Sequence, residues 1–250
     1  MNRHWILKFL AILVSVVCPL LGESTTDEAS NDLTSKLSNF EPSTNYADIS
    51  VQGWPVRVNR RLILQTDLYA MVLKELDHEL EMTARRLPTP AVSRLRKVRI
   101  WLELDNLKTP GGVYHPSAVW LSNHGFNPEK ARCVEFGVAR NFIEWPRWQP
   151  YMVMHELAHA WHHQVLGYDY QPLKEAYRLA VDSKSYDQVL HIQGQKKRHY
   201  GMNNVQEYFA ECTEAFFGIN DFYPFVRPEF LEHDPAGARA VEEAWNQAVK

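Results

Sequence analysis

Two histidines and a glutamate lie close together near the middle of the chain, at positions 155, 156 and 159. His155 and His159 are four residues apart in an apolar stretch, so on a helix their imidazoles share one face and can bind the same ion. Glu156 would project beside that ion, where its carboxylate can take a proton from bound water. The spacing therefore predicts a catalytic zinc site of the H-E-x-x-H type.

The stretch from Tyr151 to Gly167 has the pattern of a mostly buried helix. The residues beside the two histidines are largely apolar, Pro150 precedes the stretch and Gly167 ends it. Proline is common at the start of a helix and glycine just past its end. The stretch therefore predicts one apolar helix that carries both histidines. Because an H-E-x-x-H motif also occurs by chance on ordinary helices, a zinc site requires a third ligand.

The same stretch offers one candidate third ligand, His163, which lies four residues beyond His159. A third ligand on the same helix is poorly placed for a tetrahedral ion, so this candidate is a weak one. A metzincin would have a glycine three places after its second histidine and another histidine three places later. His162 and Val165 occupy those positions, which excludes that class.

A second helical stretch supplies better candidates. It runs from an asparagine cap at position 203 or 204 to Gly218, and it carries Glu207, Glu211 and Glu214 on roughly one face. Aromatic and small residues lie between these glutamates, so some of the carboxylates should be near buried surface. A buried carboxylate needs a cation or strong hydrogen bonds, and zinc held by two histidines would supply that cation.

These two stretches resemble a known family. HELAHA followed by EYFAE resembles the gluzincin zinc metallopeptidases, and most specifically the family of the anthrax lethal factor catalytic domain. The resemblance covers residues 151–218 and implies one zinc ion per chain, bound by His155, His159 and Glu207. It also implies an α+β, zincin-like metallopeptidase domain, in which a small mixed sheet packs on the active-site helix and a second helix adds a zinc ligand.

Three further residues have expected roles. Glu156 would be the general base that takes a proton from a zinc-activated water. In the family a tyrosine seven residues before the ligand glutamate assists the reaction; Tyr200 matches it here and would stabilise the developing oxyanion, or would only pack its loop. Glu211 would hydrogen-bond a ligand histidine from outside the ligand set, or be the ligand itself with Glu207 in support.

The rest of the chain contains elements that could support these two stretches. Alternating apolar and β-branched residues predict strands, whereas apolar residues at a spacing of three and four predict helices. The predicted elements are a strand or hairpin from Ile49, a helix over Thr66 to Arg86, strands over Val98 to Leu104 and Cys133 to Ile143, a helix over Leu173 to Asp182 and a closing helix over Ala236 to Val249.

The strand predicted just before the metal helix has a possible role in binding. An extended peptide can add to the edge of a sheet through backbone hydrogen bonds. Residues 134–143 are the candidate for such a rim strand, and an ordinary internal strand without substrate contact is the alternative.

The N-terminal region predicts export. Residues 1–22 combine a basic start with an apolar run too short to span a membrane comfortably, which is typical of a secretory signal peptide. Residues 23–46 are polar and predict a flexible leader, so residues 47–250 are the expected catalytic domain. We therefore expect a secreted or periplasmic protein that has no stable membrane span after signal removal.

Composition favours one enzyme domain over a nucleic-acid-binding protein. The chain has 250 residues, 45% of them hydrophobic, which is enough for one substantial core. Its net charge of -3 at pH 7 gives no support for binding nucleic acid. Cys133 and Cys212 lie outside the predicted signal peptide, and they either form one disulfide or are two small buried residues.

These features predict an exported zinc metallopeptidase that hydrolyses peptide or protein substrates. Two alternatives belong to other classes: a secreted zinc-binding interaction module without catalysis, and a zinc amidohydrolase acting on a non-peptide amide. The presence of Glu156 argues against the first alternative, because a structural metal site needs no base beside its ligands.

Overall fold

The computed structural model describes residues 40–247. The predicted signal peptide and most of the predicted leader lie outside the described residues. Regular structure within them begins with a 3-10 turn at Ser43–Asn45 and strand β1 at Tyr46–Val51, before Ile49 where order was expected. Tyr46 explains the earlier start, because its ring packs edge-on against Trp101 and its hydroxyl donates to Glu103, so the last part of the polar stretch is held in place.

A small mixed sheet of five strands is the scaffold of the first half of the chain. The strands are β1, β2 (Trp54–Asn59), β3 (Ile100–Leu102), β4 (Gly112–His115) and β5 (Cys133–Phe136), in the order β1-β2-β3-β5-β4. The hairpin predicted from Ile49 is confirmed by the antiparallel pair β1 and β2, with Gln52 and Gly53 at positive φ in its turn. β2, β3 and β5 are parallel, and β4 pairs antiparallel with β5. The prediction of an α+β chain with a small mixed sheet is confirmed.

The strand predicted over Cys133 to Ile143 is too long. β5 ends at Phe136, and residues Ala139–Glu144 form helix α5. Gly137 marks the change, since a side chain there would collide with the backbone of Thr109. β5 also pairs with a strand on each side, so residues 134–143 are not the rim that was proposed. The edge strand at this side of the sheet is β4.

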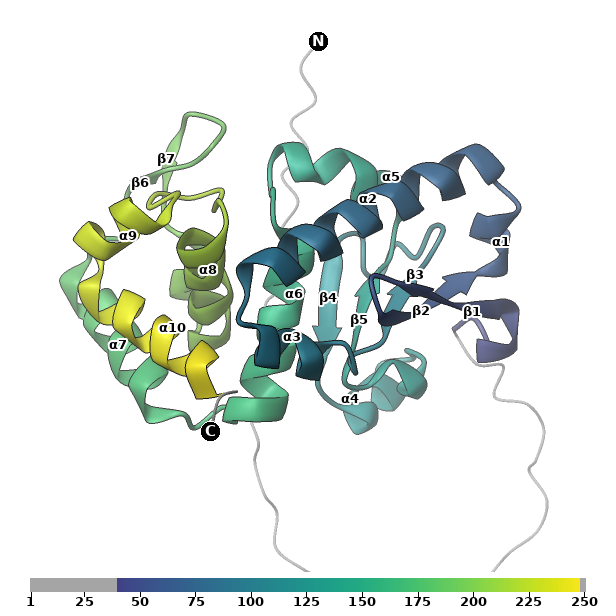
Figure 1. Ribbon diagram of the computed structural model, residues 1–250, viewed down its shortest axis with the longest axis horizontal. Coiled ribbons are helices and arrows are strands. Elements are labelled where there is room, and N and C mark those ends of the chain that lie inside the picture. Colours follow the sequence, from purple (N-terminus) through teal and green to yellow (C-terminus); the bar gives the residue numbers. More distant parts are fainter. Residues whose placement is uncertain (1–39, 248–250) are drawn as a thin grey trace, which may run out of the picture. The chain divides into compact units, whose positions relative to one another are not determined.

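Helices cover one face of the sheet. These are α1 (Arg60–Ile63), α2 (Thr66–Arg86), α3 (Thr89–Leu95), α5 and α6 (Met152–Trp161), while α4 (Ala118–Asn123) lies nearer the opposite face (Figure 1). The predicted helix over Thr66 to Arg86 is confirmed as α2. Val58, Leu102 and Phe136 on the sheet join Leu76 of α2 and Leu157 of α6 in one hydrophobic core. Full burial of each such side chain stabilises the fold by roughly 1.5–3 kcal/mol relative to leaving it exposed.

The second half of the chain is mostly helical. It contains α7 (Gln171–Ser183), α8 (Val205–Phe217), α9 (Arg227–His233) and α10 (Pro235–Asn246), together with a short ladder of β6 (Val189–Leu190) and β7 (Lys196–Lys197). The predicted helices from 173, 203 and 236 are confirmed as α7, α8 and α10. α8 packs directly against α6, as Figure 1 shows, and this contact joins the two halves at the predicted site.

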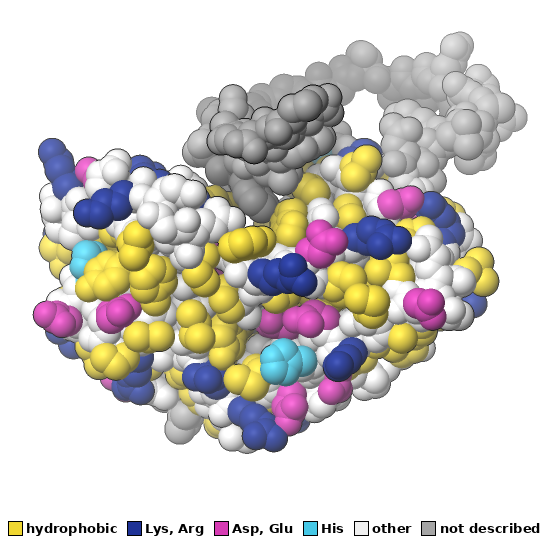
Figure 2. Space-filling model, turned by 90° about the horizontal axis from the view of Figure 1, so that it is seen from above, with side chains coloured by type: hydrophobic (Ala, Val, Ile, Leu, Met, Phe, Trp, Pro, Cys, Tyr) yellow, Lys and Arg dark blue, Asp and Glu magenta, His cyan; other side chains and the backbone are white. Residues whose placement is uncertain are grey.

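The surface carries charges of both signs. On the face seen in Figure 2, Lys, Arg, Asp and Glu side chains are interspersed with apolar ones. Cys133 and Cys212 are both free and buried, so they act as small core residues and not as a disulfide. Among the helices of residues 40–247, none is long and apolar enough to cross a membrane.

Candidate metal centre

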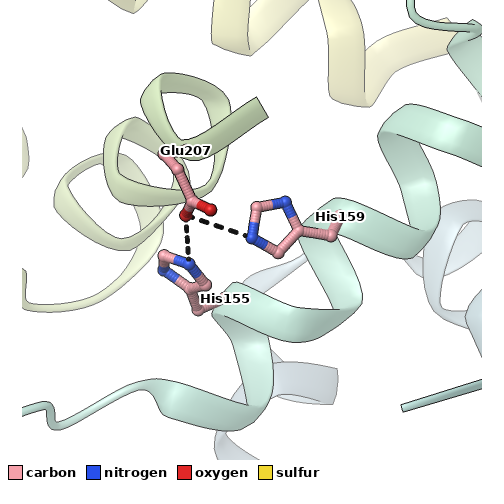
Figure 3. A group of neighbouring side chains, drawn as sticks. All are labelled: His155, His159 and Glu207. Carbon is pink, nitrogen blue, oxygen red and sulfur yellow. Dashed lines mark hydrogen bonds and ion pairs between the residues drawn. The ribbon is translucent and has the colours of Figure 1, made fainter. Parts of the chain in front are cut away.

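Helix α6 presents both predicted histidines, with His155 buried and His159 half-buried. His155 is 3% exposed, and its ring meets that of His159 edge-on with 4.8 Å between centroids. The helix continues beyond Trp161 as a π-helical turn, His162–Leu166, and ends at Gly167, which has a φ of 76°. The i, i+4 spacing therefore places the two imidazoles side by side, as Figure 3 shows.

Helix α8 brings Glu207 to these histidines. The helix begins where the side chain of Asn204 accepts a hydrogen bond from the Glu207 amide at 2.8 Å, which fixes the first turn. The Oε2 atom of Glu207 lies 3.2 Å from Nε2 of His155 and 3.3 Å from Nε2 of His159 (Figure 3). One carboxylate oxygen and two imidazole nitrogens thus converge from two helices that are far apart in sequence.

The two distances from Glu207 are close to those expected around a tetrahedral zinc ion. Zinc binds imidazole nitrogen and carboxylate oxygen at about 2.0–2.2 Å, so two ligand atoms at the tetrahedral angle are about 3.3–3.5 Å apart. The two distances from Glu207 match that edge length. His163, the other candidate ligand, instead pairs through Nδ1 with the Tyr114 hydroxyl at 2.7 Å and stacks on Tyr168. Glu207 is therefore the third donor that the geometry favours.

A second carboxylate from α8 orients His155 from behind. Oε1 of Glu214 lies 2.6 Å from Nδ1 of His155, whereas Oε1 of Glu211 lies 3.8 Å from the same nitrogen. The hydrogen bond predicted for Glu211 is thus made by Glu214. Because Glu214 follows Glu207 by two helical turns, it returns to the same side of α8 as the ligand. This contact leaves Nε2 of His155 turned toward Glu207.

Burial and repulsion between carboxylates shift the pKa values of the glutamates around this contact. Burial raises the pKa of Glu214 from 4.5 to about 7, although the hydrogen bond with His155 opposes the shift. Burial and the nearby charges of Asp221 and Glu214 raise the pKa of Glu211. Burial also opposes ionisation of Glu207, but the two histidines outweigh it and lower the pKa of that carboxyl. Glu207 is therefore the carboxylate best able to stay charged toward a cation.

Replacing Glu214 with glutamine is expected to weaken zinc binding by about 10–100-fold, since loss of the carboxyl partner that hydrogen-bonds a ligand histidine has this effect in other zinc sites. Glu211→Gln is the matched control, because it removes a buried carboxylate from the same helix without touching that hydrogen bond. The zinc affinity of this control is expected to change by less than about threefold, because Glu211 lies beyond hydrogen-bonding distance of His155. Competition with a chromophoric chelator measures both affinities. A larger loss for Glu211→Gln would assign the orienting role to Glu211.

Glu156 lies between the metal helix and the edge strand. A side chain at Gly112 of β4 would come within 3.1 Å of Oε1 of Glu156, so the glycine allows strand and carboxylate to lie in contact. Burial raises the pKa of Glu156, while the charges of His159 and His155 and a hydrogen bond from the Tyr114 amide oppose the rise. A carboxylate in such surroundings accepts a proton more readily than an exposed one.

Tyr200 begins a 3-10 turn, Tyr200–Asn203, immediately before α8. Burial raises the pKa of its hydroxyl, and the charges of Glu207, Glu211 and Glu156 raise it further. The hydroxyl therefore keeps its proton at neutral pH and can donate a hydrogen bond near these carboxylates. Tyr200 thus lies on the segment just before α8, as the sequence predicts.

Two features of the site were missed in the sequence. The sequence pattern predicts Glu214 only as part of an acidic face, and it favours residues 134–143 over β4 as the rim strand. No protein-family model, curated protein or solved structure matches the chain.

Proposed function

We propose that this chain is an exported zinc-dependent metallopeptidase with a zincin-like domain. The observation that carries the proposal is the convergence of His155, His159 and Glu207 at the spacing of a tetrahedral zinc site. The buried Glu156 beside that group supports a hydrolytic role. The signal-peptide pattern of residues 1–22 supports export.

The residues of the site divide the chemistry among them. Zinc held by the three donors would supply Lewis acidity, which acidifies a water molecule and polarises a carbonyl. Glu156 takes the proton released by that water and passes it to the leaving amine nitrogen. Glu214 holds the ring of His155, so this ligand does not have to reorganise during the reaction.

The edge strand supports a peptide as the substrate. Within residues 40–247, β4 has a strand neighbour on one side only, and its Gly112 lies against Glu156. An extended peptide that pairs with β4 through backbone hydrogen bonds would pass the catalytic carboxylate. A non-peptide amide has no backbone with which to use this edge, so β4 favours peptide hydrolysis over the amidohydrolase alternative.

A mixed peptide library, incubated with and without a zinc chelator, tests the proposal. We expect cleavage that the chelator abolishes and that added zinc restores. Zinc binding without any cleavage would favour the secreted interaction module. Cleavage that continues after the metal is removed would contradict a zinc-dependent mechanism.

Tyr200→Phe is expected to lower kcat about a hundredfold with zinc still bound, because the variant loses one donor to the developing oxyanion. The phenylalanine ring keeps the packing of the turn, so the melting temperature should change little. Steady-state kinetics on a peptide that the wild type cleaves measure kcat, and metal analysis measures the zinc content. Unchanged kcat on that peptide would leave Tyr200 with a packing role only.

A further inference from the structure

A cavity lies beside the start of the metal helix. It has a volume of about 230 Å³ and is lined by Glu75, His78 and Glu79 of α2 and by apolar and aromatic side chains that include Met82, Pro150 and Tyr151. None of these residues belongs to the three-donor group or to the proposed reaction. The cavity is therefore a separate feature of the fold.

Glu79 is a buried carboxylate without a charge partner. Its side chain is 4% exposed, and its Oε2 atom has no hydrogen-bond partner. Among residues 40–247, no lysine, arginine or histidine forms an ion pair with it. The backbone amide of Val153, at the start of α6, hydrogen-bonds the carboxylate. Glu79 thus contacts the metal helix with one oxygen, its other oxygen is buried and unpaired, and the residue lines the cavity.

An unpaired buried carboxylate is costly unless a cation or a proton compensates it. Burial raises the pKa of Glu79, and the charges of Glu75 and Glu214 raise it further. Arg86, a cation close by, lies over the Tyr151 ring at 5.6 Å and donates to the Phe217 carbonyl. A positive charge on a bound ligand would therefore be stabilised beside Glu79 in this cavity.

The lining distinguishes an organic cation from a metal ion. Atoms of Glu75, His78 and Glu79 are not among the donor groups of residues 40–247 that converge within 4.8 Å, so no metal site is preformed here. The apolar and aromatic walls instead suit a hydrocarbon chain, and a carboxylate at the end of such walls suits an ammonium group. The chemistry is that of an aliphatic primary amine.

We propose that this cavity binds a primary ammonium group on an aliphatic chain, with Glu79 as its counter-ion. A lysine side chain of a polypeptide and a free alkylamine share this chemistry. The bound cation keeps Glu79 ionised, and the ionised carboxylate continues to accept from the Val153 amide at the positive end of α6. The site does not depend on the proposed peptidase activity.

Titration of the full chain with n-butylammonium and with the peptide acetyl-Gly-Lys-Gly-amide, followed by NMR or calorimetry, tests the proposal. We expect saturable binding with a Kd of about 1–10 mM for at least one probe, and none for n-butanol. Glu79→Gln should weaken it at least about tenfold, because glutamine can still accept from Val153 but carries no charge. Glu81→Gln is the matched control, since Glu81 is two residues away and pairs with Arg85 at the surface.

The outcomes distinguish a polypeptide lysine from a free amine, and they distinguish both from the absence of a binding site. Tighter binding of the peptide assigns the site to a polypeptide lysine, and tighter binding of butylammonium assigns it to a free amine. Equal affinities in wild type and Glu79→Gln, or no saturation by either probe, would overturn the proposal. If Glu79→Gln does not fold, Glu75→Gln replaces it, because Glu75 is only half-buried at the same cavity, and its expected loss is about threefold.

Discussion

Replacing Glu156 with glutamine is expected to lower kcat by about 10²–10⁴-fold while zinc stays bound. Glutamine has nearly the same shape as glutamate but cannot take a proton from water at neutral pH. The three donors His155, His159 and Glu207 are unchanged in this variant, so the metal content should remain at one ion per chain. Kinetics on a peptide found in the library and elemental analysis of the purified protein provide the two measurements.

Glu144→Gln is the control for this variant. Glu144 is an exposed glutamate at the end of α5, and its loss should leave both kcat and zinc content unchanged. Full activity of Glu156→Gln would remove Glu156 from the chemistry. Loss of zinc in that variant would instead indicate that Glu156 holds the site together, and the lower kcat would then say nothing about proton transfer.

The elements that the sequence predicts well are those with local signals at their ends. α8 begins at the Asn204 cap and ends before Gly218. In α2, the apolar residues that pack against the core recur at helical spacing within one continuous segment. Such signals act within a few residues, so they can be recognised without knowledge of the fold. The pair of histidines follows from the same local geometry, because a helix fixes which residues share a face.

The features that the sequence does not predict depend on contacts between distant segments. β4 and β5 are both short and carry polar as well as apolar residues, and only the strand order makes β4 the edge. In the same way, the choice between Glu211 and Glu214 depends on how α8 is rotated against α6. A helical pattern places both glutamates on one side but does not fix that rotation. The cavity at Glu79 arises from a similar long-range contact, between α2 and the segment before α6.

A buried charge network on the other face of the sheet is also a product of long-range packing. Nζ of Lys130 lies 2.7 Å from Oε1 of Glu103 and 2.6 Å from Oε1 of Glu135. His115 binds the second oxygen of Glu135 at 2.7 Å. In sequence Glu103 alternates with Leu102 and Leu104, and Glu135 alternates with Val134 and Phe136, a pattern typical of a strand with one solvated face. Here both glutamates are nearly inaccessible to solvent, and Lys130 is the lysine that pairs with them.

Lys130→Met is therefore expected to destabilise the fold by about 3–5 kcal/mol at pH 7, because it leaves two buried carboxylates without their cation. Urea unfolding measures the change. Adding Glu135→Gln to this variant should recover part of the loss, since one unpaired charge is then removed. Lys174→Met, which breaks an exposed pair with Asp169, is the control and should cost less than about 1 kcal/mol. A Lys130→Met variant as stable as the wild type would show that the network does not hold the sheet.

The contact between Glu135 and Lys130 also makes the free energy of unfolding depend on pH. Burial raises the pKa of Glu135, but the hydrogen bond with His115 and the charge of Lys130 outweigh it and lower that pKa from 4.5 to about 2. Because the pKa is lower in the folded chain, the carboxylate stabilises the fold above about pH 4.5, and this contribution is lost as the pH falls toward 2. Without Lys130 the pKa of Glu135 rises. The free energy of unfolding of Lys130→Met should therefore fall less between pH 5 and 3 than that of the wild type, a difference that urea titrations at several pH values would measure.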